Sequence, residues 1–372
     1  MIRSVVVLLL VPALALGQPP RPTITLEALQ EIVDGIVAKH KIPALGVAVV
    51  TSDGLYAGML RGVRKAGTRI GVTEKDKWHL GSDTKAFTAL LAAVLAEKKL
   101  IDLDQTLEAA FPSLAKKMQA PYRKATLDQL LRHKGGLKNH LTGGKGWWIV
   151  PTTLKPRAQR LDAVARGLAL KPVADPGTKF SYSNLGYVVL AAAIEQKTGE
   201  EYAKLLEKHV LEPLGIKDAG YGPMNTLGKT DQPWQHDDKG RPRDSALVND
   251  NPPVMSPSAR LHMSLPSWAL FAQEQLKGAK GKGKLLSAEG YKRLHAPAEG
   301  EGYAPGAWIV EKEGTLTFLT HDGGNGANFC RAVLVPQADV ALLLVCNMAK
   351  PAGEKAIVEA TKTIFPRLFA PK

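Results

Sequence analysis

Segments with strand character lie toward both ends of this 372-residue sequence, and helical patterns fill the middle. Two apolar runs flank a turn at Ser52–Gly54, and two more flank the stretch VPQAD at 335–339, which are hairpin signals. Antiparallel strands from the two ends are most simply joined in one sheet. We therefore expect an α/β (α+β) fold, with an antiparallel sheet flanked by terminal helices plus an inserted all-helical domain. The expected strands are 44–50, 55–59, 307–310, 315–319, 329–335 and 340–345.

The same patterns predict the domain boundaries. Residues 18–80 and 285–372 form the expected sheet domain, and residues 81–284 form the mainly helical domain. Apolar residues at helical spacing predict helices at 26–39, 126–132, 185–197, 201–210 and 356–369.

Residues 1–17 have the features of a signal peptide. Arg3 precedes the apolar segment 5–16, and Ala15 and Gly17 are small residues suited to a cleavage site. A membrane anchor is the alternative, but the segment is shorter than the about 20 residues that span a bilayer. We expect an exported protein, periplasmic or secreted, without a transmembrane anchor.

The chain is strongly basic, with a formal net charge of +14. The densest run of lysines is KGAKGKGK at 277–284. It lacks the interleaved aromatic residues that stack on nucleic-acid bases, so we expect a solvated loop and no nucleic-acid partner. An anionic envelope polymer is a possible partner of such a surface.

Cys330 and Cys346 lie on the two strands of the last predicted hairpin. They could form a disulfide or remain two buried thiols, because the strand register is not fixed by the sequence. The cysteines show no zinc-binding spacing, and His236, Asp237 and Asp238 are contiguous, which favours a polar loop over a metal site. We expect no metal and no cofactor.

Ser82 and Lys85 are the first candidate catalytic residues. They stand at the start of the apolar helical stretch FTALLAAVL, and residues three apart share one helix face. A lysine whose pKa is lowered by burial can accept the proton of a neighbouring serine hydroxyl. The spacing Ser-x-x-Lys also occurs by chance, so further residues must support the pair.

Two later motifs supply such residues. In the sequence Tyr182-Ser183-Asn184, alternate side chains project to one side, so Tyr182 could relay a proton as a phenolate and Asn184 could hold a substrate carbonyl. A helix N-cap at Ser183 or Asn184 is the alternative role. His321, Asp322, Gly323 and Gly324 follow the strand predicted at 315–319, where glycines would let a ligand approach the backbone.

Together these motifs resemble those of serine β-lactamases and penicillin-recognising serine hydrolases, in particular the branch of class C β-lactamases, D-alanyl-D-alanine carboxypeptidases and family VIII esterases. The resemblance implies that Ser82 is the nucleophile and that Lys85 and Tyr182 share the proton relay. It implies substrate contacts from Asn184, His321, Gly323 and Gly324, with the N–H groups of Ser82 and Gly324 forming an oxyanion hole. His133 and His262 lie in landmarks expected to serve turns and packing.

The sequence His321-Asp322-Gly323 departs from the Lys-Thr-Gly usual in β-lactamases, which removes a permanent cation. With an ordinary histidine pKa near 6.5, we expect poor use of carboxylate substrates, improving as the pH falls toward 6. The predicted function is an exported serine hydrolase acting on an ester, amide or β-lactam. The alternative is a non-catalytic penicillin-binding, envelope-binding or sensor protein with the same fold.

Overall fold

The computed structural model describes residues 22–141, 146–244 and 250–369. The predicted signal peptide at 1–17 lies outside them. Within the described ranges, no helix is both long and apolar enough to cross a membrane.

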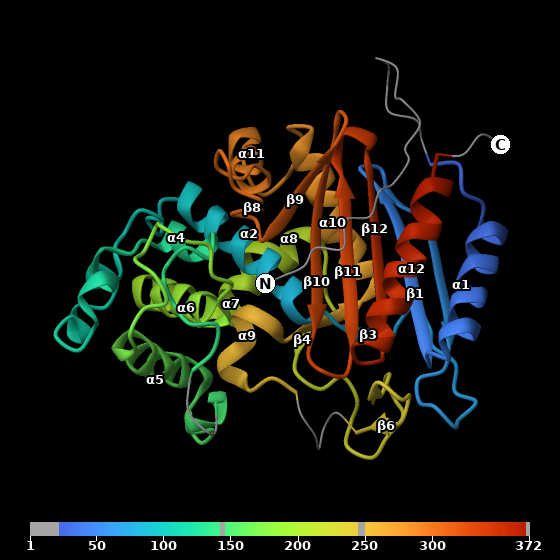
Figure 1. Cartoon of the computed structure of the whole chain (residues 1–372), viewed down its shortest axis with the longest axis horizontal. Helices are drawn as coiled ribbons and strands as arrows, with labels where there is room; N and C mark the ends of the chain where they lie inside the picture. The colour runs from blue at the N-terminus through green and yellow to red at the C-terminus, as the bar shows by residue number, and fades with distance from the viewer. Residues whose placement is uncertain (1–21, 142–145, 245–249, 370–372) are drawn as a thin grey trace.

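The central element is a seven-stranded sheet with the order β2-β1-β12-β11-β10-β9-β8, in which every neighbouring pair is antiparallel (Figure 1). The prediction of one antiparallel sheet built from both ends is confirmed, because β1 pairs with β12. The strands are β1 (Ala44–Thr51), β2 (Gly54–Gly62), β8 (Tyr303–Ala304), β9 (Trp308–Glu313), β10 (Leu316–Gly324), β11 (Phe329–Val335) and β12 (Val340–Cys346).

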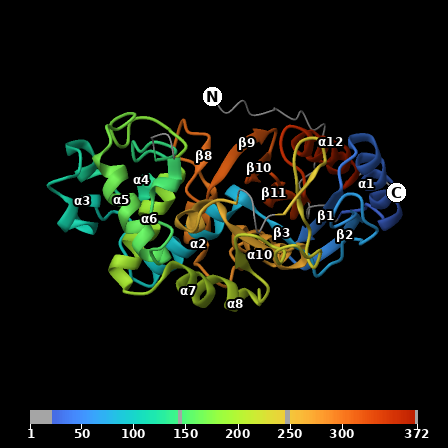
Figure 2. The same ribbon diagram turned by 90° about the horizontal axis from the view of Figure 1, so that it is seen from below.

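Helices cover both faces of this sheet. Helices α1 (Leu26–His40) and α12 (Ala352–Arg367) pack on one face, and α10 (Leu265–Ala279) packs on the other, as Figure 2 shows from below. The two faces belong to separate apolar cores. Strand side chains alternate between faces, so a strand buried on both sides is apolar throughout, as β12 is.

The cysteines lie on opposite faces of the sheet. Cys330 pairs across the ladder with Val345, and Cys346 pairs with Phe329, which is an offset of one residue. Cys330 consequently belongs to the core beneath α10 and Cys346 to the core beneath α1 and α12. Both are buried free thiols, which decides between the two alternatives left open by the sequence.

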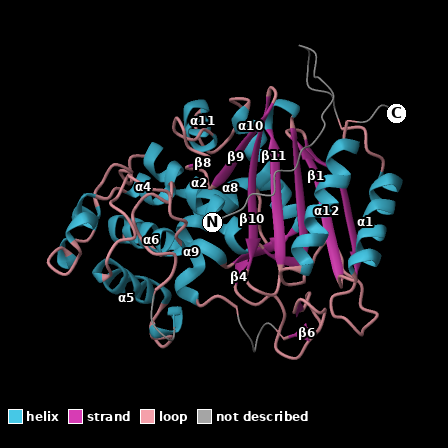
Figure 3. Ribbon diagram, in the orientation of Figure 1, coloured by secondary structure: helices cyan, strands magenta, loops and turns pink. Residues whose placement is uncertain are grey.

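Most of the remaining helices gather beside the sheet rather than on it (Figure 3). Helices α2 and α6 are buried on all sides over most of their length, which explains their nearly continuous Ala, Leu and Val content. The helices are α2 (Thr84–Glu97), α3 (Leu107–Ala110), α4 (Leu127–Leu131), α5 (Pro156–Ala169), α6 (Asn184–Thr198), α7 (Tyr202–Leu206), α8 (Glu212–Leu214), α9 (Ser256–Ala259) and α11 (Ala288–His295).

Several local predictions need correction. The single helix predicted at 201–210 is α7 followed by a π-helical turn at Glu207–Leu211. Short strands also occur between the helices, in a three-stranded sheet ordered β3-β7-β4 and in a two-stranded sheet. These strands are β3 (Lys77–His79), β4 (Gly220–Tyr221), β5 (Gln235–His236), β6 (Pro242–Arg243) and β7 (Leu261–Ser264).

Candidate active site

Ser82 lies in a tight turn between β3 and α2. The turn is a short 3-10 helix at Gly81–Asp83, so Ser82 precedes α2 rather than lying within it. Gly81 has φ of +48°, and a Cβ atom there would lie 2.1 Å from the backbone nitrogen of Gly324. Only glycine fits both constraints. The turn therefore brings Ser82 directly beside the end of β10.

The Lys85 side chain is fully buried on the first turn of α2. Its Nζ lies 2.6 Å from Asn184 Oδ1, 2.8 Å from the Ser258 carbonyl oxygen and 3.3 Å from Ser82 Oγ. Burial lowers the pKa of Lys85 well below its ordinary value. A neutral amine has two N–H groups and one lone pair. The two carbonyl-type oxygens can accept those N–H groups, which leaves the lone pair for the proton of Ser82.

Tyr182 and Asn184 come from the start of α6. Ser183 is the N-cap, since its Oγ accepts a hydrogen bond of 2.8 Å from Gly186 N–H. The capping alternative and the approach of Tyr182 and Asn184 to Lys85 therefore occur together. The Asn184 amide also donates to Asn139 Oδ1 at 3.0 Å, which fixes its Oδ1 toward Lys85.

The Tyr182 ring centroid lies 4.7 Å from Lys85 Nζ. Burial raises the pKa of Tyr182, and this outweighs the opposing effect of its hydrogen bond with Ser82. The resting side chain is thus a neutral phenol, and the phenolate considered from the sequence is wrong for this state. A phenol can still pass a proton between two partners.

The segment from His321 to Gly324 lies within β10, not after the strand as predicted. Glycine is uncommon in strands, which is why the sequence pattern ended too early. A Cβ on Gly323 would lie 2.0 Å from the Leu80 carbonyl oxygen, so this glycine allows β10 to pack against the Ser82 turn. Asp322 points elsewhere and forms a two-pronged pair with Arg331, with distances of 2.6 and 2.7 Å.

His321 is buried, and its Nδ1 is hydrogen-bonded to the Ala307 carbonyl oxygen. A carbonyl can only accept, so Nδ1 carries the ring hydrogen and Nε2 remains an acceptor. Burial lowers the pKa of His321 to about 4, against the effect of the Ala307 hydrogen bond. The ordinary pKa assumed from the sequence is wrong for this position, and His321 is neutral at pH 7.

Asp83 was not recognised from the sequence, although it stands between Ser82 and Lys85. Its buried Oδ2 accepts a hydrogen bond from the Cys330 thiol at 3.1 Å. Burial raises the pKa of Asp83 well above its ordinary value. The charge of Asp83 would raise the pKa of Lys85, but this effect is smaller than the lowering caused by burial.

Two histidines accept hydrogen bonds from the backbone of the turns that carry Tyr182 and Ser82. His133 Nδ1 accepts a hydrogen bond of 3.1 Å from Ser183 N–H, so this residue positions the turn that carries Tyr182. His79 Nδ1 accepts from Gly81 N–H at 3.0 Å, next to Ser82, and its Nε2 lies 3.0 Å from Asp250 Oδ1. Asp250 Oδ1 also accepts from Asn325 at 3.1 Å, next to Gly324. Asp250 therefore joins the Ser82 turn to the end of β10, and no motif marks it.

Asp250→Asn should lower the free energy of unfolding. Burial alone would raise the pKa of Asp250, but His79 and Arg260 hold it down to about 2. A lowering of nearly two pH units corresponds to about 2 kcal/mol at pH 7. This stabilisation is complete above the unfolded pKa near 4 and is lost as the pH falls toward 2. Urea unfolding should therefore show a smaller difference between wild type and variant at pH 3 than at pH 7.

The matched control is Asp162→Asn, which removes a solvent-facing pair with Arg166. Such pairs contribute about 0.5 kcal/mol or less. An equal cost for both substitutions would contradict the bridging role of Asp250.

Within the described residues, no group of three or more His, Cys, Asp or Glu side chains could hold a metal ion. The His236–Asp238 segment serves other contacts. His236 bonds to the Asn347 carbonyl oxygen at 2.8 Å, and Asp237 pairs with Arg241 at 2.6 Å.

An antiparallel sheet with helices on both faces, and a Ser-x-x-Lys turn packed against one of its strands, define the β-lactamase/transpeptidase-like class of folds. The sequence profile of the Beta-lactamase family matches residues 29–361, so the chain belongs to this family of serine hydrolases. The resemblance stated from the motifs is confirmed at this level.

Individual relatives are distant. The chain is 22% identical to "Protein flp" of Staphylococcus aureus strain MW2 over 333 residues, which cover 87% of this chain and 63% of that protein. It thus spans less than two thirds of that relative. It is 25% identical to "Penicillin-binding protein 4" of Amycolatopsis lactamdurans over 362 residues, 92% of each. The crystal structure of a class C β-lactamase from Rhodobacter sphaeroides matches with a TM-score of 0.73 and 19% identity, covering 91% of this chain and 99% of that one.

Proposed function

We propose that this protein is a serine hydrolase that works through an acyl-enzyme on Ser82. The observation that carries the proposal is the environment of Lys85. Its buried Nζ has two carbonyl-type acceptors at 2.6 and 2.8 Å and faces Ser82 Oγ as its third neighbour. A non-catalytic binding protein would not need a desolvated lysine aimed at a serine hydroxyl.

In the proposed reaction, Ser82 Oγ attacks the substrate carbonyl carbon while neutral Lys85 accepts the hydroxyl proton. The negative charge that develops on the carbonyl oxygen lies near the N–H groups of Ser82 and Gly324. The proton then reaches the leaving group through Tyr182, and the bond between the carbonyl carbon and the leaving group breaks. Water releases the acyl group by the reverse sequence of proton transfers.

The proposed substrates are neutral short-chain esters. A carboxylate beside the scissile bond would meet neutral His321, whose free ring nitrogen is an acceptor, instead of a lysine cation. Penicillins carry such a carboxylate. They should therefore acylate Ser82 slowly or be hydrolysed poorly.

Steady-state kinetics with p-nitrophenyl butyrate and nitrocefin test this preference. We expect ready turnover of the ester and poor turnover of nitrocefin at pH 7. Because the pKa of His321 is about 4, carboxylate substrates should gain nothing between pH 8 and pH 6, in contrast to the expectation from the sequence. Only as the pH approaches that value should the ratio of carboxylate-substrate to neutral-ester kcat/KM rise, because protonation of Lys85 lowers both rates.

His321→Lys, with its fold checked by circular dichroism, should raise the ratio of nitrocefin to ester turnover. A nitrocefin kcat/KM of about 10⁶ M⁻¹s⁻¹ or more in the wild type, with negligible ester turnover, would overturn the substrate proposal. Mass spectrometry of the acylated Ser82 peptide tests the acyl-enzyme itself, whichever substrate is preferred.

A further inference from the structure

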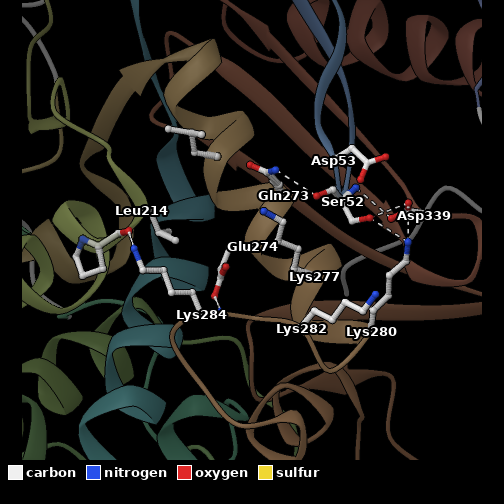
Figure 4. Close-up of a pocket in the computed structure, with 12 residues that line it drawn as sticks. Ser52, Asp53, Leu214, Gln273, Glu274, Lys277, Lys280, Lys282, Lys284 and Asp339 are labelled. Atoms are coloured by element: carbon white, nitrogen blue, oxygen red, sulfur yellow. Dashed lines mark hydrogen bonds and ion pairs between the residues drawn. The ribbon is translucent and has the colours of Figure 1, made fainter.

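A concave site lies away from Ser82, between α8, α10 and the β1–β2 turn (Figure 4). It has a volume of about 600 Å³ and contains four lysines, Lys277, Lys280, Lys282 and Lys284. We call it the lysine groove. Three acidic residues, Asp53, Glu274 and Asp339, also line it, and Ser52 and Pro213 are the other lining residues used below.

The lysine groove and the candidate active site lie at opposite ends of the sheet. Gly324 pairs with Phe329, which pairs with Cys346. The turn at Ser52 follows the other end of β1, where Val50 pairs with Ala341. A ligand in the lysine groove therefore does not enter the Ser82 site.

Lys280, Lys282 and Lys284 are exposed, in agreement with the solvated loop expected from the sequence, whereas Lys277 lies at the end of α10. Cβ atoms on Gly278 and Gly283 would lie 2.2 and 2.1 Å from atoms of the Tyr291 ring, which shows that the chain passes closely around that ring. Glu274 Oε1 accepts hydrogen bonds from Lys284 N–H at 2.6 Å, from Leu285 N–H at 2.9 Å and from the Tyr291 hydroxyl. The glycines make this close packing possible, and the lysines project from a fixed backbone.

Two of the four ammonium groups already have partners. Lys280 Nζ lies 2.6 Å from Asp339 Oδ2 and 3.0 Å from Ser52 Oγ, and Lys284 Nζ donates to the Pro213 carbonyl oxygen at 2.7 Å. Lys277 and Lys282, by contrast, form no side-chain hydrogen bond or ion pair with any described residue. Lys277 lies between Lys284 on one side and Lys280 and Lys282 on the other (Figure 4).

This arrangement suits an anion whose charges repeat along a chain. The groove contains lysines but no arginine, so it lacks the planar fork with which arginine holds a single carboxylate or phosphate group through two parallel hydrogen bonds. A lysine ammonium is a compact charge that suits the oxygens of a phosphate from any direction. No aromatic side chain lines the groove, so nucleic-acid bases would find no stacking surface.

We propose that the lysine groove binds a linear, non-nucleic polyanion whose phosphate groups repeat along the chain, with Lys277 and Lys282 as its principal contacts. Lys280 and Lys284 line the same groove and lie beside the bound polyanion. Bound phosphates would meet positive charge at several points along the groove, in a surface whose backbone needs no rearrangement. The assignment does not depend on the reaction at Ser82.

Short-chain inorganic polyphosphate is the probe, and isothermal titration calorimetry at low salt is the measurement. The double variant Lys277→Gln/Lys282→Gln should bind about tenfold more weakly, since each exposed charge pair contributes about 1 kcal/mol or less in water. The slope of log K against log salt should decrease by roughly 1.5, for two lost phosphate contacts. Turnover of p-nitrophenyl butyrate should be unchanged, which also verifies the fold.

The matched control is Lys116→Gln/Lys117→Gln, which removes the same charge from another exposed surface. Its affinity for polyphosphate should stay within twofold of the wild type. Equal losses in both double variants would assign binding to the overall charge of the protein and overturn the site. No loss in the groove variant would overturn it as well.

Two further ligands distinguish the chemistry. Poly-glutamate of matched charge should bind more weakly than polyphosphate, and so should a single-stranded DNA oligonucleotide of matched charge. Equal or tighter binding of poly-glutamate would refute the preference for phosphate. Equal or tighter binding of DNA would identify the groove as a nucleic-acid site instead.

Discussion

Ser82→Ala is expected to abolish hydrolysis of p-nitrophenyl butyrate and to leave the fold intact. Loss of the nucleophile of such a catalytic unit costs on the order of 10⁶-fold in kcat. The fold should persist because Lys85 keeps its two shorter contacts, to Asn184 and to the Ser258 carbonyl oxygen. Rates measured on protein purified in parallel, with circular dichroism as the check on folding, give the comparison.

A fluorophosphonate probe supplies an independent measurement for this variant. It should label the wild type on the peptide that contains Ser82 and leave Ser82→Ala unlabelled. Ser258→Ala is the matched control, because Lys85 contacts the backbone oxygen of Ser258 and not its hydroxyl. Wild-type turnover in Ser82→Ala would remove Ser82 from the mechanism.

Lys85→Arg should lose activity nearly as completely as Ser82→Ala. Arginine stays protonated at all accessible pH values, so it cannot accept the Ser82 proton. In the wild type, kcat/KM should fall as the pH drops through the lowered pKa of Lys85, because protonation removes the lone pair that faces Ser82. A pH profile of kcat/KM with a neutral ester measures this directly.

Tyr182→Phe tests whether the phenol acts on the same proton. The single variant should be impaired, and the double variant Tyr182→Phe/Lys85→Arg should be little worse than Lys85→Arg alone. If the two losses multiply instead, Lys85 and Tyr182 act in separate steps.

The pH profile gives a further check on Lys85. If kcat/KM of the wild type for the neutral ester stays constant as the pH falls, Lys85 is not the base.

Some elements were predictable because a local pattern determined them. Helix α1 and strand β1 match their predicted ranges to within one residue, because one has helical apolar spacing and the other is an apolar run that ends at a turn. Strand β2 was predicted in the right place but continues three residues beyond its predicted end at 59. The short strand β3, which leads into the Ser82 turn, was not predicted. A strand of three residues has too few positions to show alternation.

The candidate site likewise combines residues that local spacing reveals with residues whose importance depends on tertiary contacts. Ser82, Lys85, Tyr182 and Asn184 were found because they stand in recognisable spacings, and the structure brings them together. Asp250 could not be found, because its importance comes from touching residues near 79 and 325, far from it in the chain. The pKa of His321 was predicted in the wrong range because it depends on burial, which the sequence motif does not state.

The pairing of β1 with β12 has a consequence for the order in which the protein can form. Leu45 finds its partner at Cys346, about 300 residues later, which at about 5–20 residues per second is 15 to 60 s of synthesis. Until then β1 has only β2 beside it, and strands β8 to β11 can pair with one another but are not joined to β1. Ser82, Lys85 and Tyr182 are all synthesised long before β10, which packs against the Ser82 turn, so a nascent chain carries these three residues before the sheet beside them is complete.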